Sequence, residues 1–359
     1  MIVCIEKSVF ENAVTEEARM QLSFLLYLVV YKTCYVLSIK DDVTETDYYK
    51  SLPQSLQEVL GSAFLASVTA STEADCLVGL GYESETKERK FSLQESISYL
   101  LEPSSVVLEN GLNDAFFITA VLRCYDDSMQ MVDFLEKGWL QFDNAGGCGN
   151  IKNFLQARVN HYKNKTKFLK CFVVVDGDCQ YTGQEQTKYN NLKKYLEKWG
   201  IGYHILEKRT MENYMPMAVL DAQRGAMKRE WTQAYSALTP QQRDHLSISG
   251  GFSQDIPKVK KENLKNDIKK FKKQKKHLND NFFVRNYIKG KRQQLYADVS
   301  NGSFVHLALG YPIEGVFKEE FPKLYKEPSI TRNDFDVLTQ HQTNRHELAG
   351  LAEAIASII

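Results

Sequence analysis

The chain has 359 residues, of which 43% are hydrophobic and 25% are charged, so it can bury a sizeable core and is not broadly disordered. A chain of this length is predicted to form about two domains. Lysine and arginine together number 45, and so do aspartate and glutamate, which excludes adhesion to polyanions through bulk charge. Nucleic-acid binding would therefore need a local basic patch.

The cysteines and the start of the chain indicate the compartment. The seven cysteines contain no C-x-x-C pair, which argues against a zinc ribbon or a redox motif. Their odd number is typical of the reducing cytoplasm, where we expect this protein, and no signal-peptide pattern is present. The apolar run over residues 22–39 contains Lys32, which favours a buried helix and a short strand over a membrane span.

Residues 1–100 form the first region along the chain. They hold 15 acidic and 8 basic residues, a net charge of −7, and they show no pattern that indicates chemistry. We predict a mixed, mainly helical region that serves as an interaction or dimerisation module.

Residues 101–216 alternate short apolar runs with helical patterns. The predicted strands cover residues 105–108, 139–142, 168–175 and 203–206, and the predicted helices cover 114–124, a segment from 150 onward, and 185–199. This β-α-β-α-β-α-β order predicts a parallel sheet with right-handed crossovers and helices on both faces. In such α/β sheets, ligands bind at the edge where the strands end.

Acidic residues follow three of these strands. Glu109 follows the first, Asp176 and Asp178 follow the third, and Glu212 lies beyond the fourth. The topology would bring these carboxylates together, where they raise each other's pKa unless a cation relieves the repulsion. Mg²⁺ prefers oxygen ligands, and two such ions about 4 Å apart can activate a water and stabilise the leaving oxygen of a phosphodiester. We expect Asp176 and Asp178 to point the same way from an extended segment, with Gly177 allowing close backbone approach.

Three segments together resemble the Toprim domain, the metal-binding fold shared by topoisomerases, primases and a group of nucleases. They are VVLENGLNDAFF, with Glu109, Gly111 and Asp114, then FVVVDGD, and then LEKRTMENYMP. The last segment and the glycine turn NAGGCGNIKNF are similar to nucleases of the overcoming-lysogenization-defect type and their stand-alone bacterial relatives. The resemblance covers about residues 104–216 and implies a Rossmann-like parallel sheet.

The resemblance implies a metal-dependent endonuclease that hydrolyses phosphodiester bonds in DNA or tRNA. Glu109, Asp176 and Asp178 would hold one or two Mg²⁺ or Mn²⁺ ions, and Glu109 would also act as general base. Asp114 and Glu212 would be further ligands or would orient the others. Asp114 also fits a helix-start residue favoured by the helix dipole, and Glu212 also fits a salt bridge.

Lys208 or Arg209 would stabilise the charge on the scissile phosphate, and alternation along the strand end does not decide which of them faces the site. Asn213 and Tyr214 fit either a substrate contact or a capping and packing role. The glycine turn 146–150 at a helix start could cradle a phosphate or be a tight turn.

The resemblance also bears on partners. Cys179, Gln180 and Tyr181 replace the further acidic residues of the topoisomerase and primase forms, which puts strand passage and priming in doubt. No Walker A sequence occurs, so an ATPase would act in trans or be absent. Similar stand-alone proteins act as toxic effectors in bacterial defence against phage under the control of a partner ATPase, and we expect the same here.

Residues 217–359 are predicted to be mainly helical and to carry the basic segment 258–292. That segment holds 14 basic and 3 acidic residues. It is either a solvated helical face or a surface that contacts the phosphate backbone. The residues predicted to contact nucleic acid are Arg209, Lys269, Lys270, Lys272, Lys273, Lys275 and Lys276. The apolar end of the chain is predicted to pack or oligomerise.

Two other functions fit parts of the pattern. A D-x-D after an apolar strand also occurs in haloacid-dehalogenase phosphatases and nucleotide-sugar glycosyltransferases, which would not need Glu109. Gln180 stands where the dehalogenase pattern has Thr or Val, which counts against that family. The third possibility is a non-catalytic subunit that uses the fold as a scaffold.

Overall fold

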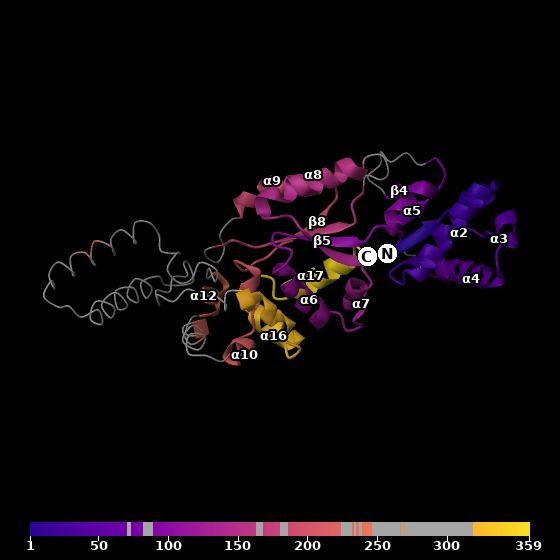
Figure 1. The fold of residues 1–359 in the computed structure, drawn as a ribbon. Coiled ribbons are helices and arrows are strands. Elements are labelled where there is room, and N and C mark those ends of the chain that lie inside the picture. The colour runs from indigo at the N-terminus through magenta and orange to yellow at the C-terminus, as the bar shows by residue number, and fades with distance from the viewer. Residues whose placement is uncertain are drawn as a thin grey trace.

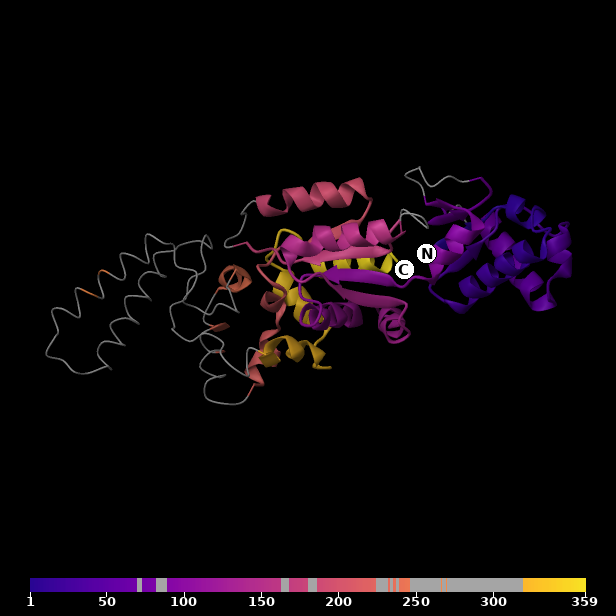
Figure 2. The ribbon, with the colours of Figure 1, turned by 45° about the horizontal axis from the view of Figure 1, so that its top comes forward.

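The described residues form two four-stranded parallel sheets that are covered by helices (Figures 1 and 2). A computed structural model describes residues 1–69, 73–81, 89–162, 168–179, 186–223, 232, 235, 236, 239–245, 266, 269 and 319–359. The predicted α/β class with a parallel sheet is confirmed. Over the described ranges, the helices are all too short or too polar to span a membrane.

The N-terminal sheet has the strand order β2-β1-β3-β4. Its strands are β1 (Ile2–Ile5), β2 (Val36–Ser38), β3 (Cys76–Val78) and β4 (Lys90–Phe91). Its helices are α1 (Lys7–Glu11), α2 (Glu16–Tyr31), α3 (Asp47–Ser51), α4 (Gln54–Thr69) and α5 (Leu93–Leu101). As expected, this region is mainly helical, since α2 and α4 have 16 residues each and the strands have at most four. Its parallel sheet was not predicted, because strands of two to four residues are too short to show a periodic pattern. The buried helix and short strand predicted over 22–39 are confirmed as α2 and β2.

The second sheet has the order β6-β5-β7-β8 and contains the four predicted strands. They are β5 (Ser104–Leu108), β6 (Leu140–Asn144), β7 (Cys171–Val175) and β8 (Gly202–Ile205). The helices of this unit are α6 (Asp114–Tyr125), α7 (Gln130–Glu136), η1 (Cys148–Asn150), α8 (Ile151–Tyr162), η2 (Thr187–Tyr189), α9 (Asn190–Lys198) and η3 (Met211–Tyr214). β7 begins at Cys171, later than predicted. Before it, the ring of Phe168 packs against the ring of Phe91 in the N-terminal unit, with centroids 5.5 Å apart.

Alternating residues of the second sheet build two separate cores. Val106 and Val174 belong to the core that contains α6, whereas Val107 and Val173 belong to the core that contains α8 and α9. This alternation follows from the pleat, which points successive side chains to opposite faces. The strands are therefore buried on both faces, as expected of a parallel sheet.

The C-terminal part of the chain completes the second unit. Its elements are α10 (Met217–Asp221), α12 (Pro240–His245), η4 (Phe321–Lys326), α16 (Arg332–Thr339) and α17 (Glu347–Ala356). Leu351 and Ile355 of α17 are buried in the core that contains α6, so the prediction that the apolar end of the chain packs is confirmed. The Ser104 hydroxyl donates to the Ile358 carbonyl at 2.7 Å, and both chain termini lie between the two sheets (Figure 1).

Two lysines are buried where the N-terminal unit meets the second sheet. Lys170 is 3% exposed, and its Nζ donates to the Tyr35 hydroxyl at 2.6 Å and to the Glu102 carbonyl at 2.9 Å. Lys32 donates to the Leu100 carbonyl at 2.8 Å. Burial, together with the charge of Lys32, lowers the pKa of Lys170 to about 7. The protonated ammonium therefore destabilises the folded chain.

Replacing Lys170 by methionine is expected to remove a pH-dependent part of the stability. A lysine in the unfolded chain titrates at ~10.4, so between about pH 7 and that value the unfolded state binds more protons than the folded state. The free energy of unfolding of the wild-type protein should therefore rise with pH in this window, by up to about 1 kcal/mol per pH unit. Urea unfolding across the window measures this slope. Lys170→Met should lose it and the exposed control Lys194→Met should keep it, whereas equal slopes in all three proteins would contradict the assignment.

Candidate active site

The acidic residues that follow β5 and β7 meet at one edge of the second sheet. These strands are neighbours, with Leu108 paired to Val174, so Glu109 and Asp176 emerge side by side. The Glu109 Oε1 accepts a hydrogen bond from the Asp176 N–H at 3.3 Å. The prediction that these distant acids come together is confirmed for this pair.

The glycine turn after β6 holds Glu109 in place. The Cys148 N–H donates to Glu109 Oε2 at 3.1 Å, and the Gly147 N–H donates to the Glu109 carbonyl at 2.8 Å. Gly147 has a φ of 110°, which side-chain-bearing residues rarely adopt. Of the two interpretations of this turn, the structure shows a tight turn whose N–H groups orient a carboxylate.

Asp176 lies among three other carboxylates. Burial raises the pKa of Asp176 well above its usual range, and the charges of Glu212, Asp114 and Glu109 raise it further. A hydrogen bond from the Met211 N–H to its Oδ1, at 2.9 Å, opposes this shift. All four acids are partly buried, so they keep access to solvent. We call Glu109, Asp114, Asp176 and Glu212 the acidic cluster.

Asp114 belongs to this cluster although it lies at the start of α6. Its Oδ2 accepts the Asn110 N–H at 2.8 Å, which closes the loop between β5 and α6. Burial, and then the charges of Glu212 and Glu109, raise the pKa of Asp114 to about 7. Asp114 therefore does lie at a helix start, as one interpretation predicted. Its carboxylate also interacts electrostatically with Glu212 and Glu109.

Replacing Asp114 by asparagine is expected to stabilise the protein when divalent ions are removed by EDTA. The pKa of Asp114 is raised from 3.8 to about 7, so between these two pH values the folded state keeps a proton that the unfolded state has lost. The stability that this proton contributes is lost as the pH rises through about 7. Above about pH 7 the charged carboxylate opposes folding, and Asp114→Asn should gain about 1–2 kcal/mol there while keeping an oxygen for the Asn110 N–H. Urea unfolding in EDTA at acidic and alkaline pH measures this. A variant that is less stable than wild type at alkaline pH would refute the electrostatic account.

The Asp178 side chain does not point in the expected direction. Its φ is 51°, in the left-handed region, so the D-G-D segment is not extended and Asp176 and Asp178 do not point the same way. The Asp178 carboxylate forms an ion pair with Lys188. The expectation for Gly177 is confirmed, because a Cβ at this position would lie 2.2 Å from the Lys208 carbonyl oxygen.

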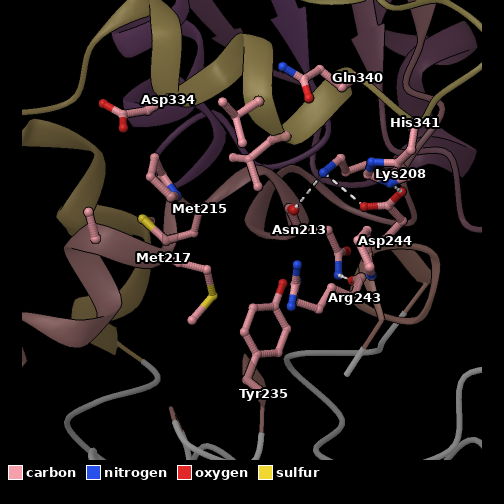
Figure 3. Close-up of a pocket in the computed structure, with 15 residues that line it drawn as sticks. Lys208, Asn213, Met215, Met217, Tyr235, Arg243, Asp244, Asp334, Gln340 and His341 are labelled. Atoms are coloured by element: carbon pink, nitrogen blue, oxygen red, sulfur yellow. Dashed lines mark hydrogen bonds and ion pairs between the residues drawn. The ribbon is translucent and has the colours of Figure 1, made fainter. Parts of the chain in front are cut away.

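Lys208 and Arg209 are both anchored to α12. Lys208 is 1% exposed, its Nζ lies 2.8 Å from Asp244 Oδ1, and it also donates to the Asn213 carbonyl (Figure 3). Arg209 donates from its N–H to the Asp244 carbonyl at 2.8 Å and from Nη1 to the His245 carbonyl at 3.2 Å. The backbone bends at residues 207–210, just beyond β8, so strand alternation could not predict these directions.

Asn213 and Tyr214 have the capping and packing roles that were one of their two interpretations. Asn213 Oδ1 accepts the Thr210 N–H at 2.9 Å and closes the start of η3. The Tyr214 hydroxyl donates to Glu347 of α17 and accepts the Lys208 N–H at 3.2 Å. The segment that carries Glu212 is thus fixed at both ends.

Sequence reasoning missed three residues at the site. Lys188 carries a charge that lowers the pKa of Glu109, against the effect of burial. The Tyr189 hydroxyl donates to the Asp176 carbonyl at 2.5 Å. The Glu347 carboxylate, from the opposite end of the chain, accepts the Glu207 N–H at 2.8 Å. Lys188 and Tyr189 follow a polar loop and Glu347 is a distant partner, so no local motif pointed to them.

Of the lysines predicted to contact nucleic acid, the structure describes only one. Lys269 is exposed in a helical backbone, whereas Lys270, Lys272, Lys273, Lys275 and Lys276 lie outside the described residues. Within the described ranges, no three His, Cys, Asp or Glu side chains are arranged as a ready-made metal-ligand set. The acidic cluster is therefore an electrostatic grouping, in which Glu109, Asp114 and Asp176 accept hydrogen bonds from backbone N–H groups.

Comparison of the chain with protein-family models, with curated proteins and with solved structures gives no match. The case for a function therefore depends on the geometry of the site.

Proposed function

We propose that this protein is a metal-dependent nuclease of the Toprim type that hydrolyses phosphodiester bonds in DNA or RNA. The observation that carries this proposal is the convergence of carboxylates at the buried Asp176, whose pKa is raised by burial and then by the charges of Glu212, Asp114 and Glu109. These residues come from the ends of β5 and β7, from the start of α6 and from η3, and their mutual repulsion destabilises the fold. Sites of this kind are enriched in catalytic groups.

The donor set fits Mg²⁺ or Mn²⁺ in its chemistry. All four groups of the acidic cluster are carboxylates, and hard divalent cations prefer oxygen ligands. Their partial exposure leaves room for water and substrate oxygens. Backbone N–H groups orient Glu109, Asp114 and Asp176, and the further lone pairs of these carboxylates could bind the ion. The ion would supply an activated water and neutralise charge on the phosphate.

The chain's own residues have separate roles in this proposal. Glu109 has a raised pKa, which suits a group that accepts a proton from an attacking water. Lys188 is exposed and acts electrostatically on Glu109, so it is better placed than Lys208 to contact a substrate phosphate. Tyr189 holds the backbone of Asp176 and thereby positions the carboxylate.

The test is cleavage of plasmid DNA and of total tRNA by the full-length protein with Mg²⁺, with Mn²⁺ and with EDTA. The proposal expects metal-dependent cleavage of at least one substrate. Hydrolysis of phosphate monoesters or of nucleotide sugars without phosphodiester cleavage would support the phosphatase or glycosyltransferase alternative. The absence of cleavage with either metal, also when a candidate ATPase partner is added, would support the scaffold alternative.

Replacing Lys188 by methionine is expected to lower the cleavage rate by about ten- to a hundredfold, because a cation that meets the developing phosphate charge is lost. The matched change Lys194→Met, at an exposed position of α9, should leave the rate unchanged. Lys208→Met should instead lower the stability, because it leaves the buried Asp244 carboxylate without its ion-pair partner. Equal rates for wild type and Lys188→Met would remove this residue from the proposed site.

The biological setting follows from the resemblance alone. We extend the proposal to a cytoplasmic effector of bacterial defence against phage, held in check by a separate ATPase subunit. Co-purification with, and inhibition by, a candidate ATPase partner would test that part.

A further inference from the structure

The outward face of α2 is apolar, which is unusual for a helix at the surface of a protein. Met20, Phe24, Tyr27, Val30 and Tyr31 are each between 44% and 73% exposed, while the opposite face of the helix is buried in the N-terminal core. A surface helix normally turns charged and polar side chains to water, and a helix that is apolar on every side is normally buried. We call these five residues the α2 stripe.

The other long helix of the same unit shows the normal pattern. α4 also has 16 residues, and its exposed positions mix the apolar Leu65 with the polar Gln54 and Glu58. In α2, by contrast, every exposed residue from Met20 to the end of the helix is apolar or aromatic. Methionine and aromatic side chains are enriched at the cores of protein–protein interfaces, so the composition of the α2 stripe indicates a surface that is covered in an assembly.

The spacing of the α2 stripe suits a second helix of the same kind. Met20, Phe24, Tyr27 and Tyr31 are separated by four, three and four positions, which is the spacing of the apolar seam between paired helices. A two-fold axis that passes between Phe24 and Tyr27, perpendicular to the helix, would bring Phe24 opposite Tyr27 of a second copy and Met20 opposite its Tyr31. The stripe is therefore complementary to itself, as the interface of a two-fold dimer must be.

Charge and shape both favour an antiparallel pair of α2 helices over a parallel pair. Glu16 and Glu17 are exposed in the first turn of α2, so a parallel pair would bring four carboxylates together at a cost in free energy. The other end of α2 meets the second unit, where the rings of Tyr31 and Trp139 lie 5.9 Å apart. An antiparallel pair separates the acids and places the two copies of the second unit at opposite ends of the helix pair.

The exposed area of the α2 stripe approaches what a stable dimer needs. Large side chains of this kind bury about 150–250 Å² each, so five of them that are about half exposed offer roughly 500 Å² of apolar surface. A stable interface takes about 800 Å² from each partner. The flanks of α2 and the exposed Leu101 of α5 can supply the remainder, since the Leu101 carbonyl accepts the Lys32 Nζ at the end of α2.

A lipid surface is a poorer partner for this helix. Helices that lie in a membrane interface carry lysine and arginine on their polar face, which attract anionic headgroups. α2 contains one basic residue, Arg19, against the acids Glu16 and Glu17, and residues 1–100 carry a net charge of −7. Repulsion from anionic lipid therefore opposes this mode of binding.

We propose that this protein forms a two-fold symmetric dimer in which α2 packs antiparallel against α2 of a second copy through the α2 stripe. The proposal makes the interaction role expected for residues 1–100 specific, and it does not depend on the nuclease function.

Sedimentation velocity of the full-length protein over a range of concentrations measures the dimer. Phe24→Glu and Tyr27→Glu should each raise the dissociation constant of the dimer about thirtyfold or more, as the loss of an interface hot spot does. Leu65→Glu, the same kind of change at an exposed position of α4, should sediment as wild type does. All three positions are exposed, so circular dichroism should show each variant folded. The proposal is overturned if wild type stays a monomer up to about 100 μM, or if folded Phe24→Glu and Tyr27→Glu dimerise as wild type does.

Disulfide cross-linking between copies reads the direction of the helix pair. Oxidation of a mixture of Met20→Cys and Tyr31→Cys proteins should give a mixed dimer, because a disulfide needs Cα atoms within about 7 Å and the antiparallel pair brings these two positions together. Met20→Cys alone should give no new cross-link, since its two copies would lie about 16 Å apart along the helices. Peptide mass spectrometry distinguishes the new bond from any made by the seven native cysteines.

Two outcomes would contradict this arrangement. Cross-links between two copies of position 20 would show a parallel pair. Binding of monomeric wild type, but not of Phe24→Glu, to vesicles of phosphatidylcholine and phosphatidylserine would assign the α2 stripe to a lipid surface instead.

Discussion

The Asp176→Asn variant is expected to lose metal-dependent cleavage by at least about 10³-fold while becoming more stable in EDTA at alkaline pH. The asparagine side chain would keep an oxygen for the Met211 N–H, which donates to Asp176 Oδ1 at 2.9 Å, so the change removes charge with little change of shape. The raised pKa of Asp176 means that its ionised form opposes folding, and removing that charge relieves the repulsion from Glu212, Asp114 and Glu109. Opposite effects on activity and stability are typical of a strained functional site.

Asp178→Asn is the matched control for this prediction. It makes the same chemical change two positions away, at a side chain that is 42% exposed and paired with Lys188. Asparagine tolerates the left-handed backbone of this position, so we expect a cleavage loss below about tenfold and no gain in stability. Single-turnover cleavage rates and urea unfolding give the two quantities. If Asp178→Asn were the more damaging change, the metal site would have to be moved toward the exposed end of the D-G-D segment.

The Glu347→Leu variant is expected to lose about 3–5 kcal/mol of stability. The Glu347 side chain is fully buried and accepts hydrogen bonds from the Glu207 N–H at 2.8 Å, from Gln342 Nε2 at 3.1 Å and from the Tyr214 hydroxyl. It also lies 2.9 Å from His204 Nε2. Leucine would leave these polar groups buried without an acceptor, and each such group costs about 1–3 kcal/mol.

The control for this prediction is Glu353→Leu, the same change at an exposed position of the same helix, α17. It should alter the free energy of unfolding by less than about 0.5 kcal/mol, because no buried partner is lost. Because Glu347 holds both Glu207 and Tyr214, Glu347→Leu should also release the segment that carries Glu212 and reduce cleavage. Equal stability of the two variants would show that α17 does not depend on this carboxylate.

The second sheet, formed by β5 to β8, could be predicted from the sequence because its strands are buried on both faces. Runs such as residues 171–175 are uniformly apolar and are followed directly by acidic residues, so their ends are visible in the sequence. Parallel topology then places Glu109 beside Asp176, and the hydrogen bond between these residues agrees with that reasoning. The proximity of Glu109 and Asp176 is the part of the site that followed from strand order alone.

The rest of the site depends on contacts that no local pattern encodes. The direction of Asp178 is set by a left-handed φ and by its N–H, which donates to the Arg209 carbonyl at 2.8 Å from another strand end. Lys208 is turned away by Asp244, which lies 36 positions along the chain. The N-terminal sheet was missed for a different reason, since its strands have at most four residues. Local patterns thus located the strand ends, whereas tertiary contacts decided which side chains face the cluster.

The position of Mn²⁺ in crystals of the wild-type protein, located by its anomalous scattering, is the most direct test of the account. The account predicts an ion within about 2.0–2.6 Å of carboxylate oxygens of Glu109 and Asp176, and its loss in Asp176→Asn. The claim that these carboxylates share a divalent ion would be contradicted if saturating Mn²⁺ bound only elsewhere. It would also be contradicted if the ion stayed at the same place in Asp176→Asn.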